Sequence, residues 1–147
     1  MICKAKIKIE SIIDNLDSAG LPEGDPEKSV SDTDGIFRYS NDEARITYKE
    51  SSEGGVCETE IVCSFGGVSV KRCGAIESLL YFKEGETHSS LYSVPPYKFD
   101  AEIKARRVTV ELNEDGGRIN LVYNMKIGGA EKSAIMRIWI CKASNQA

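Results

Sequence analysis

The sequence predicts an all-β protein, an antiparallel up-and-down β-barrel of about eight to ten strands. Apolar residues recur at every second position, and no stretch shows the three-and-four spacing of a helix over several turns. Turn signals separate the strand-like runs at short intervals, as in antiparallel hairpins. The alternation also shifts by one residue at Arg106-Arg107, which indicates a β-bulge that bends a strand around a barrel. Closure is favoured over a sandwich because it removes strand edges.

Size and composition predict one domain spanning residues 1–147. With 147 residues, 41% hydrophobic and 29% charged, the chain is long enough to bury a single core. It holds no run of about 18 apolar residues, so no membrane helix is expected. The first ten residues alternate lysine with apolar residues, which predicts a strand rather than a secretory signal. We therefore expect a cytoplasmic protein with no membrane partner.

Charge and cysteine content limit the partners and cofactors that the chain is expected to bind. A net charge of -4 argues against a nucleic-acid partner, because such binding depends on clustered positive charge. Lys98, Lys104, Arg106 and Arg107 are interpreted as a solvated strand face. The five cysteines include no C-x-x-C pair, so neither a zinc site nor a disulfide framework is indicated. We expect them to be reduced and mostly buried, and no cofactor is predicted.

The N-terminal third holds one clear strand and one interruption. Ala5, Ile7 and Ile9 alternate with lysines in a half-buried strand. From Asn15 to Asp34 prolines, glycines and acidic residues interrupt the pattern, which predicts a long loop or flap, either functional or without a role, with a strand resuming near Ser29. The D-T-D-G at residues 32–35 lacks the first Asp and last Glu of a calcium-binding loop, so calcium is not predicted.

The middle of the chain predicts a series of hairpins. Strands are expected at residues 35–39, 44–50, 57–65, 68–74, 77–83 and 87–92, with turns at 40–43, Gly66-Gly67 and Glu84-Gly85. Within residues 68–74, Arg72 shares a face with Val68 and Val70. Pro95-Pro96 cannot donate ladder hydrogen bonds, so the sheet is expected to break or to reach an edge there.

The C-terminal third predicts three more strand segments. Ala101, Ile103 and Ala105 alternate in one phase, and Val108 to Leu112 alternate in the other, on either side of the bulge. After a turn at residues 113–117, the alternation from Ile119 to Ile127 is the strongest in the chain. The last strand is expected at residues 134–140, with Trp139 on the outer face.

Arg72 is the residue that most suggests a binding site. An inward guanidinium is costly unless paired, and its five donors suit a carboxylate or another planar acceptor. The alternative is a structural role, either in an ion pair with Glu50 or stacked against Trp139 or a tyrosine. Tyr48, Tyr92 and Tyr123 lie in phase with apolar neighbours, so they line a cavity with Arg72 or fill the barrel.

His88 is the one histidine, and any mechanism with a histidine base must use it. Catalysis would require a nucleophile and an orienting acid within hydrogen-bond reach, and no Ser or Cys motif supplies one. We interpret His88 as an exposed strand residue or a ligand contact. The protein is not expected to be an enzyme, and no metal site is predicted.

Ordered motifs across the chain give a family resemblance. They are R-x-G at Arg72 to Gly74, a tyrosine at Tyr92 before a proline corner, and G-R-I-x-L-x-Y at Gly117 to Tyr123. The chain resembles the bacterial YwiB-like proteins of unknown function over about residues 2 to 141. The resemblance implies a calycin-like barrel, similar in architecture to lipocalins, and carries over no catalytic residue. The chain differs at Pro95-Pro96-Tyr97 and in the loop after Asn15.

Two functions remain open at this stage. The first is binding of a small amphipathic or anionic molecule in the barrel, with Arg72, Tyr48, Glu50, His88, Tyr92 and Tyr123 as candidate contacts. The second is a filled barrel that acts in protein interaction or as a homodimer, through an uncapped edge near Pro95. An open cavity lined by Arg72 would favour the first function, and a packed interior would favour the second.

Overall fold

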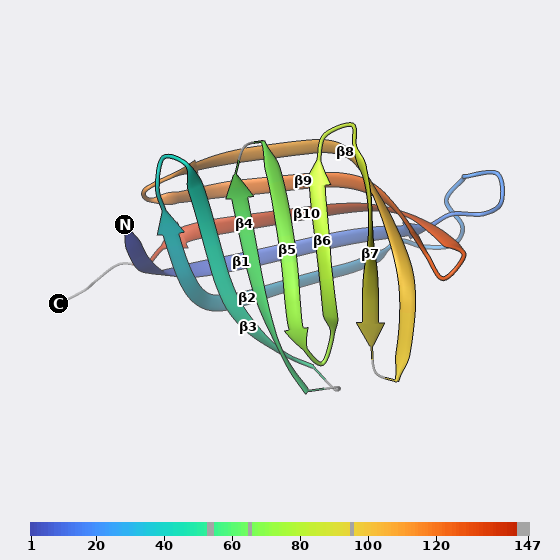
Figure 1. The fold of residues 1–147 in the computed structure, drawn as a ribbon, viewed down its shortest axis with the longest axis horizontal. Coiled ribbons are helices and arrows are strands. Elements are labelled where there is room, and N and C mark those ends of the chain that lie inside the picture. The colour runs from blue at the N-terminus through green and yellow to red at the C-terminus, as the bar shows by residue number, and fades with distance from the viewer. Residues whose placement is uncertain (53–54, 65, 95, 144–147) are drawn as a thin grey trace.

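Ten antiparallel strands close into a barrel in the computed structural model of this chain (Figure 1). The structure describes residues 1–52, 55–64, 66–94 and 96–143. Each strand pairs with the next in sequence, and β1 closes the barrel against β10. The strands are β1 (Ile2–Asn15), β2 (Glu27–Tyr39), β3 (Glu43–Ser52), β4 (Gly55–Ser64), β5 (Gly67–Gly74), β6 (Glu77–Lys83), β7 (Thr87–Val94), β8 (Tyr97–Asn113), β9 (Gly116–Ile127) and β10 (Ala130–Lys142). The predicted all-β antiparallel barrel is confirmed, including the upper end of the expected strand number.

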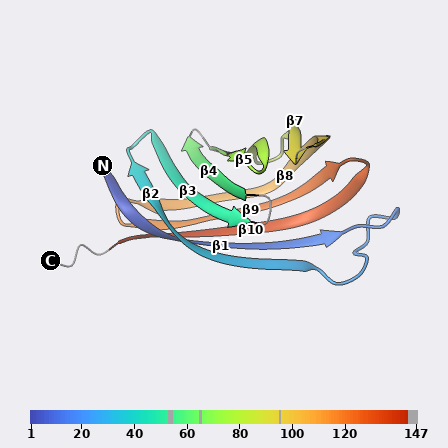
Figure 2. The same ribbon diagram turned by 90° about the horizontal axis from the view of Figure 1, so that it is seen from below.

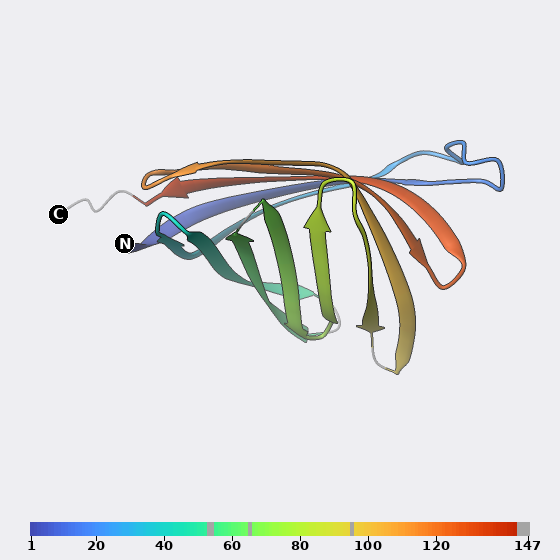
Figure 3. The ribbon, with the colours of Figure 1, turned by 45° about the horizontal axis from the view of Figure 1, so that its top comes forward.

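The barrel is flattened into two layers that cross at a steep angle. β1, β9 and β10 run across the back in Figure 1, and β3 to β7 cross in front of them. Figures 2 and 3 show the two layers from other sides, with β2 and β8 curving from one layer into the other. These two strands therefore form the corners of the barrel.

A bulge and a glycine mark these corners. In β8 the register with β9 shifts between Ala105 and Arg107, which confirms the predicted bulge. In β2 pairing with β3 begins at Gly35, where an added Cβ would meet the Thr47 carbonyl and the Ile7 side chain. A residue without a side chain allows the backbones to approach at this bend.

The turn between β6 and β7 stabilises the bulge. The Val108 backbone N–H donates to the Glu84 Oε1 atom at 3.1 Å. The Gly85 N–H donates to the Ala105 carbonyl at 2.9 Å. Ala105 and Val108 lie beyond the last β7–β8 pair, Thr87 with Lys104, so their backbone groups on that side find partners on the turn between β6 and β7 instead.

Inward side chains form successive rows across the front wall, and the upper rows are apolar. One row joins Ala44, Cys63, Val68 and Phe82, and the next joins Ile46, Ile61, Val70 and Leu80. All eight are buried. Phe82 of β6 and Tyr123 of β9 meet edge to face, with ring centroids 4.8 Å apart. Because these residues come from opposite walls, the middle of the barrel is filled rather than hollow.

Several strand segments have a neighbour on one side only, among the residues that the structure describes. β2 pairs with β1 from Glu27 onward but with β3 only from Gly35. β8 pairs with β7 from Tyr97 but with β9 only from Ala101. The pairing of β6 with β7 consists of Glu77 with Ser93 and Ser78 with Tyr92. The barrel therefore has open edges despite its closure.

The structure corrects several sequence-based expectations. The strand that was expected to resume near Ser29 begins at Glu27, so the loop after Asn15 is shorter than residues 15–34 and the D-T-D-G lies inside β2. The Gly66-Gly67 turn is also wrong by one residue, since Gly67 already pairs with Ser64. Two of the five cysteines, Cys57 and Cys63, are buried, so "mostly buried" is wrong as well. β10 extends at both ends beyond the predicted residues 134–140.

Some expectations fall at the limit of the described residues. Pro95 lies outside them, as does Phe65, so the predicted break at Pro95-Pro96 is described only by its flanks. On these flanks Val94 of β7 pairs with Tyr97 of β8. The expected edge is present just beyond it, along the first four residues of β8, Tyr97 to Asp100.

Candidate functional site

The polarity of the interior changes at the third inward row of the front wall. Register pairs connect Tyr48 of β3 with Thr59 of β4, then Arg72 of β5, Ser78 of β6 and Tyr92 of β7. We call these five residues the polar row. Directly paired side chains on one face of a sheet lie about 4.5 to 5.5 Å apart at their Cβ atoms. Residues that are far apart in sequence are therefore brought side by side.

The polar row lies next to one end of the barrel, which we call the lower mouth. The strand ends at which β3, β5 and β7 finish and β4, β6 and β8 begin surround this end, at the bottom of Figure 1. Glu50 and Cys57, which pair with each other, lie one inward row closer to the rim. Arg72, Tyr92 and Glu50 are half-buried, whereas Tyr48, Thr59 and Ser78 are buried. The row is therefore accessible to solvent from the mouth.

Arg72 has no hydrogen bond or ion pair with any residue in the described parts of the chain. The expected structural alternatives of an ion pair with Glu50 or a stack on Trp139 are absent among these residues. Trp139 instead lies on the outer face under Lys8, whose Nζ atom is 5.4 Å from the ring centroid. An inward guanidinium thus keeps its donors free toward the mouth.

The charge of Arg72 affects the pKa values of tyrosines on two walls of the barrel. Burial raises the pKa of Tyr48 to about 12, the Glu50 carboxylate adds to this, and the Arg72 guanidinium opposes it. Burial likewise raises the pKa of Tyr123, and Arg72 again opposes the shift. Both hydroxyls therefore stay neutral at physiological pH and are able to donate hydrogen bonds. Tyr123 belongs to the floor beneath the polar row because it packs on Phe82.

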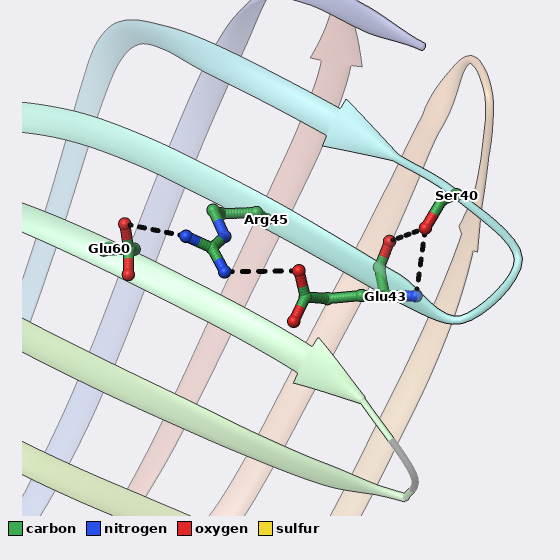
Figure 4. Close-up of polar contacts among 4 residues, drawn as sticks. All are labelled: Ser40, Glu43, Arg45 and Glu60. Carbon is green, nitrogen blue, oxygen red and sulfur yellow. Dashed lines mark hydrogen bonds and ion pairs between the residues drawn. The ribbon is translucent and has the colours of Figure 1, made fainter.

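Comparison with the other arginines shows why Arg72 is unusual. Arg45 lies on the outer face of β3, where it contacts Glu43 at 3.2 Å and Glu60 at 3.6 Å (Figure 4). Arg118 and Arg137 also contact carboxylates, those of Glu111 and Glu10. Arg38, Arg106 and Arg107 have no such partner among the described residues, but they are exposed. Arg72 alone in the described chain combines an inward position with the lack of a carboxylate.

The outer cluster around Arg45 is a structural network. The Ser40 hydroxyl accepts from the Glu43 backbone N–H at 3.3 Å and donates to the Glu43 carbonyl at 3.0 Å. These bonds close the turn between β2 and β3, and Glu43 then holds Arg45 (Figure 4). Because the Arg45 guanidinium already contacts two carboxylates, this cluster offers little to an anionic ligand.

His88 does not join the polar row. Its Nε2 atom lies 3.0 Å from the Glu86 carboxylate, and this hydrogen bond is the main cause that lowers the pKa of Glu86. The ring also meets Tyr81 edge to face, with centroids 4.8 Å apart. This contact bridges β6 and β7 where they have no register pairs among the described residues. His88 is thus a partly exposed strand residue with a bridging contact.

Sequence reasoning missed Ser78 as a member of the site. Its side chain is 7% exposed, and its Oγ atom has no hydrogen-bond partner among the described residues. The signal was present, because Ser78 is in phase with Leu80 and Phe82, which are both buried. Thr59, in contrast, is inward as its phase predicted.

Two hollows of about 700 and 670 Å³ lie away from Arg72. The first lies along β1 to β4, and charged side chains such as Lys4, Lys6 and Glu58 surround a mainly apolar lining that includes Ile36 and Tyr48. The second follows the open edge of β8 and includes Phe99, Ser90 and Lys98. It borders the lower mouth, because Phe99 pairs with Tyr92 of the polar row.

The fold and the site together define a class: a closed ten-stranded antiparallel barrel with a filled middle and one polar, arginine-bearing mouth. Among the described residues no helix is long and apolar enough to cross a membrane, and no cluster of metal-ligating side chains occurs.

Comparison with known proteins places the chain in a family. Residues 7–138 match the model of a domain of unknown function, DUF1934, and the chain belongs to that family. It is 24% identical over 110 residues to an uncharacterised β-barrel protein, YwiB of Bacillus subtilis strain 168, covering 75% of this chain and 78% of that protein. The crystal structure of the Bacillus subtilis ywiB protein superposes with a TM-score of 0.84 at 21% identity, covering 97% and 94% of the two chains. The resemblance to the YwiB-like proteins is thereby confirmed, and the shared barrel with it.

Proposed function

We propose that the protein binds a small anionic or amphipathic molecule at the lower mouth of the barrel and does not act as an enzyme. The observation that carries this proposal is the unpaired, inward guanidinium of Arg72, surrounded by neutral hydroxyl groups of the polar row. A half-buried charge without a partner is costly, and proteins tolerate such a cost mainly where a ligand completes the site.

The filled interior determines where the ligand lies. Phe82 and Tyr123 close the barrel beneath the polar row, so the ligand does not enter the middle as it would in a lipocalin-like cavity. Its charged group would contact Arg72, and the tyrosines would form the walls. We therefore propose that the barrel is calycin-like in its architecture, as the family resemblance implies, but not in having a central ligand cavity.

Further parts of the proposal concern location and partners. The five cysteines are all free, which supports a reducing compartment such as the cytoplasm. The net charge of -4 argues against nucleic acid as a partner. His88 has an acid neighbour in Glu86 but no nucleophile beside it among the described contacts, which supports a role without catalysis.

Native mass spectrometry of the protein purified from expressing cells tests the proposal. We expect extra mass on the wild type that disappears on denaturation and is absent from the Arg72→Leu variant. An exposed arginine provides the matched control, and Arg38→Leu should keep the extra mass. A bare wild-type mass, or extra mass that Arg72→Leu retains, would argue against ligand binding at this mouth.

A second candidate function is self-association through the open edge of β8. Tyr97 is 64% exposed and Phe99 is 38% exposed on a segment that pairs on one side only, and their rings stack with centroids 6.4 Å apart. An unpaired edge with exposed aromatic residues is suited to pairing with the same edge of a second copy. Light scattering should then show a dimer that Phe99→Glu dissociates and Val30→Glu, on the β2 edge, leaves intact. A monomer at all concentrations would exclude this candidate.

A further inference from the structure

The buried hydroxyl of Ser78 adds a second unsatisfied group to the lower mouth. Ser78 lies between Arg72 and Tyr92 in the polar row, and its Oγ atom has no partner among the described residues. Buried side-chain hydroxyls almost always have a partner, so an orphan beside an unpaired guanidinium requires an explanation. A ligand oxygen that accepts from both residues would satisfy both at once.

The groups around these two residues are mainly hydrogen-bond donors. Arg72 offers five N–H groups in a planar fork, and Ser78 offers one O–H. Tyr48 and Tyr92 of the polar row each carry a hydroxyl, and Tyr123 carries one on the facing wall, near enough for Arg72 to affect its pKa. Such a set fits an acceptor with two oxygens in one plane, and an arginine fork matches a carboxylate in this way.

The charge at the mouth favours one negative charge on the ligand. Arg72 is the single cation in the polar row, and Glu50 lies one inward row nearer the rim. Glu50 forms no ion pair with a described residue, so its charge also acts on the mouth. With Glu50 counted, the Arg72 charge is already offset at the empty mouth, so a phosphate dianion would add two negative charges and a monocarboxylate would add one, which is the smaller repulsion from Glu50.

An apolar surface continues from the polar row onto β8. Tyr92 pairs with Phe99, and Phe99 stacks with Tyr97. Both residues of this stack are accessible. The hollow of about 670 Å³ runs along Phe99, which forms its apolar side, while Lys98, Asp100, Glu102 and Lys126 form a charged side. A volume of this order accommodates a small organic molecule.

We propose that the lower mouth binds a monocarboxylate with an apolar body. The carboxylate accepts from the Arg72 fork and from the Ser78 hydroxyl, and the apolar body lies against Tyr92 and Phe99. This inference rests on the proposed function, and it adds the class of ligand and the role of Ser78. An aliphatic and an aromatic acid share this chemistry.

Calorimetric titration of the wild type with four probes tests the class of ligand. Octanoate and benzoate represent the two sources of carboxylate, octanol has the apolar body without charge, and inorganic phosphate has charge without the body. We expect at least one carboxylate to bind about tenfold or more tightly than octanol and phosphate, as charge-assisted hydrogen bonds imply. Whichever carboxylate binds more tightly identifies the shape of the body.

Substitutions in the polar row test the contacts. Arg72→Lys keeps the charge but loses the fork, and it should weaken carboxylate binding about tenfold. Ser78→Ala should weaken it severalfold while the melting temperature of the free protein stays the same or rises, because the variant removes an orphan hydroxyl. Ser69→Ala on the outward face of β5 should change neither quantity.

The outcomes separate this inference from the proposed function. Phosphate or octanol binding as tightly as the carboxylates would overturn the ligand class while leaving a binding site at the mouth. Extra mass that depends on Arg72 in native spectra, without carboxylate binding, would do the same. Loss of stability in Ser78→Ala with unchanged affinity would overturn the role of Ser78. If no probe binds and the purified protein carries no extra mass, both proposals fail.

Discussion

Replacing Arg72 by leucine separates a binding role from a structural one. Arg72 has no hydrogen bond or ion pair with the described residues, so the variant removes no internal electrostatic contact. Its side chain is half-buried, and leucine places apolar atoms in a position next to Val70, which is buried. We therefore expect the free energy of unfolding to change by less than about 1 kcal/mol, or to rise slightly.

A structural arginine would behave differently. Removing one partner of a buried ion pair costs about 3 to 5 kcal/mol, because the other charge stays buried without compensation. Arg45 provides an internal comparison, since it contacts both Glu43 and Glu60 at partly exposed positions. Such pairs contribute roughly 0.2 to 1 kcal/mol each, so Arg45→Leu, which removes two of them, should destabilise the protein by about 0.4 to 2 kcal/mol.

Urea unfolding followed by circular dichroism measures both variants on one scale. The reasoning about Arg72 is refuted if Arg72→Leu loses more than about 3 kcal/mol or fails to fold. That result would mean that the guanidinium supports the fold through groups near it, such as Glu50. A small change in stability together with loss of ligand would assign Arg72 to binding.

Three further predictions concern the pH dependence of stability, the bulge in β8 and a close backbone approach in β9. The folded pKa of Tyr48 is about 12, against 10.0 for a free side chain. The contribution of Tyr48 to the free energy of unfolding is therefore fully present below pH 10 and declines by roughly 2 to 3 kcal/mol as the pH rises through 12. Unfolding curves at pH 9 and pH 11 should show a smaller decline in stability for Tyr48→Phe than for the wild type, and equal declines would contradict the assignment. Glu84→Ala removes the acceptor of the Val108 N–H and should lower the free energy of unfolding by about 0.5 to 1.5 kcal/mol. Glu84→Gln keeps an acceptor oxygen and should lower it less. Identical losses of stability in thermal melts would argue against this hydrogen bond. Gly117→Ala should lower the free energy of unfolding by more than about 2 kcal/mol, because Gly117 has a φ of +140° and an added Cβ would meet the Glu111 carbonyl. Gly129→Ala, with open space around it, should cost about 1 kcal/mol. Similar losses of stability in the two variants would contradict the close backbone approach at Gly117.

Local patterns in the sequence predicted the parts of the fold that depend on alternation. The change of phase between Ala105 and Val108 located the bulge, and the spacing of Val68, Val70 and Arg72 placed the arginine inside. These predictions succeeded because one buried face imposes a period of two on the residues.

Alternation does not account for the first half of β2, although a strand was expected to resume near Ser29. From Glu27 to Val30 the strand is exposed on both faces, and Val30 itself is 56% exposed. Without a buried face there is no alternation, and the composition of this segment resembles a loop. Pairing with β1 holds it in the sheet instead, which is a tertiary effect that overrides local preference.

The candidate site was predictable only in part. Arg72, Tyr48, Tyr92 and Tyr123 were selected from their phases, but their convergence depends on the register of several strand pairs. Register is a non-local property that alternation within one strand does not determine. For this reason Ser78 was missed, and His88, which faces Glu86 and Tyr81, was included.

The central claim is that the Arg72 guanidinium is free toward the lower mouth and available to a ligand. Nuclear magnetic resonance of the arginine Nε–H groups tests it directly, in the free protein and during titration with octanoate or benzoate. We predict that the Arg72 signal exchanges rapidly with solvent in the free protein and shifts on titration, while the signals of Arg45 and Arg38 stay in place. An Arg72 signal that is already protected in the free protein and does not respond to either acid would contradict the account.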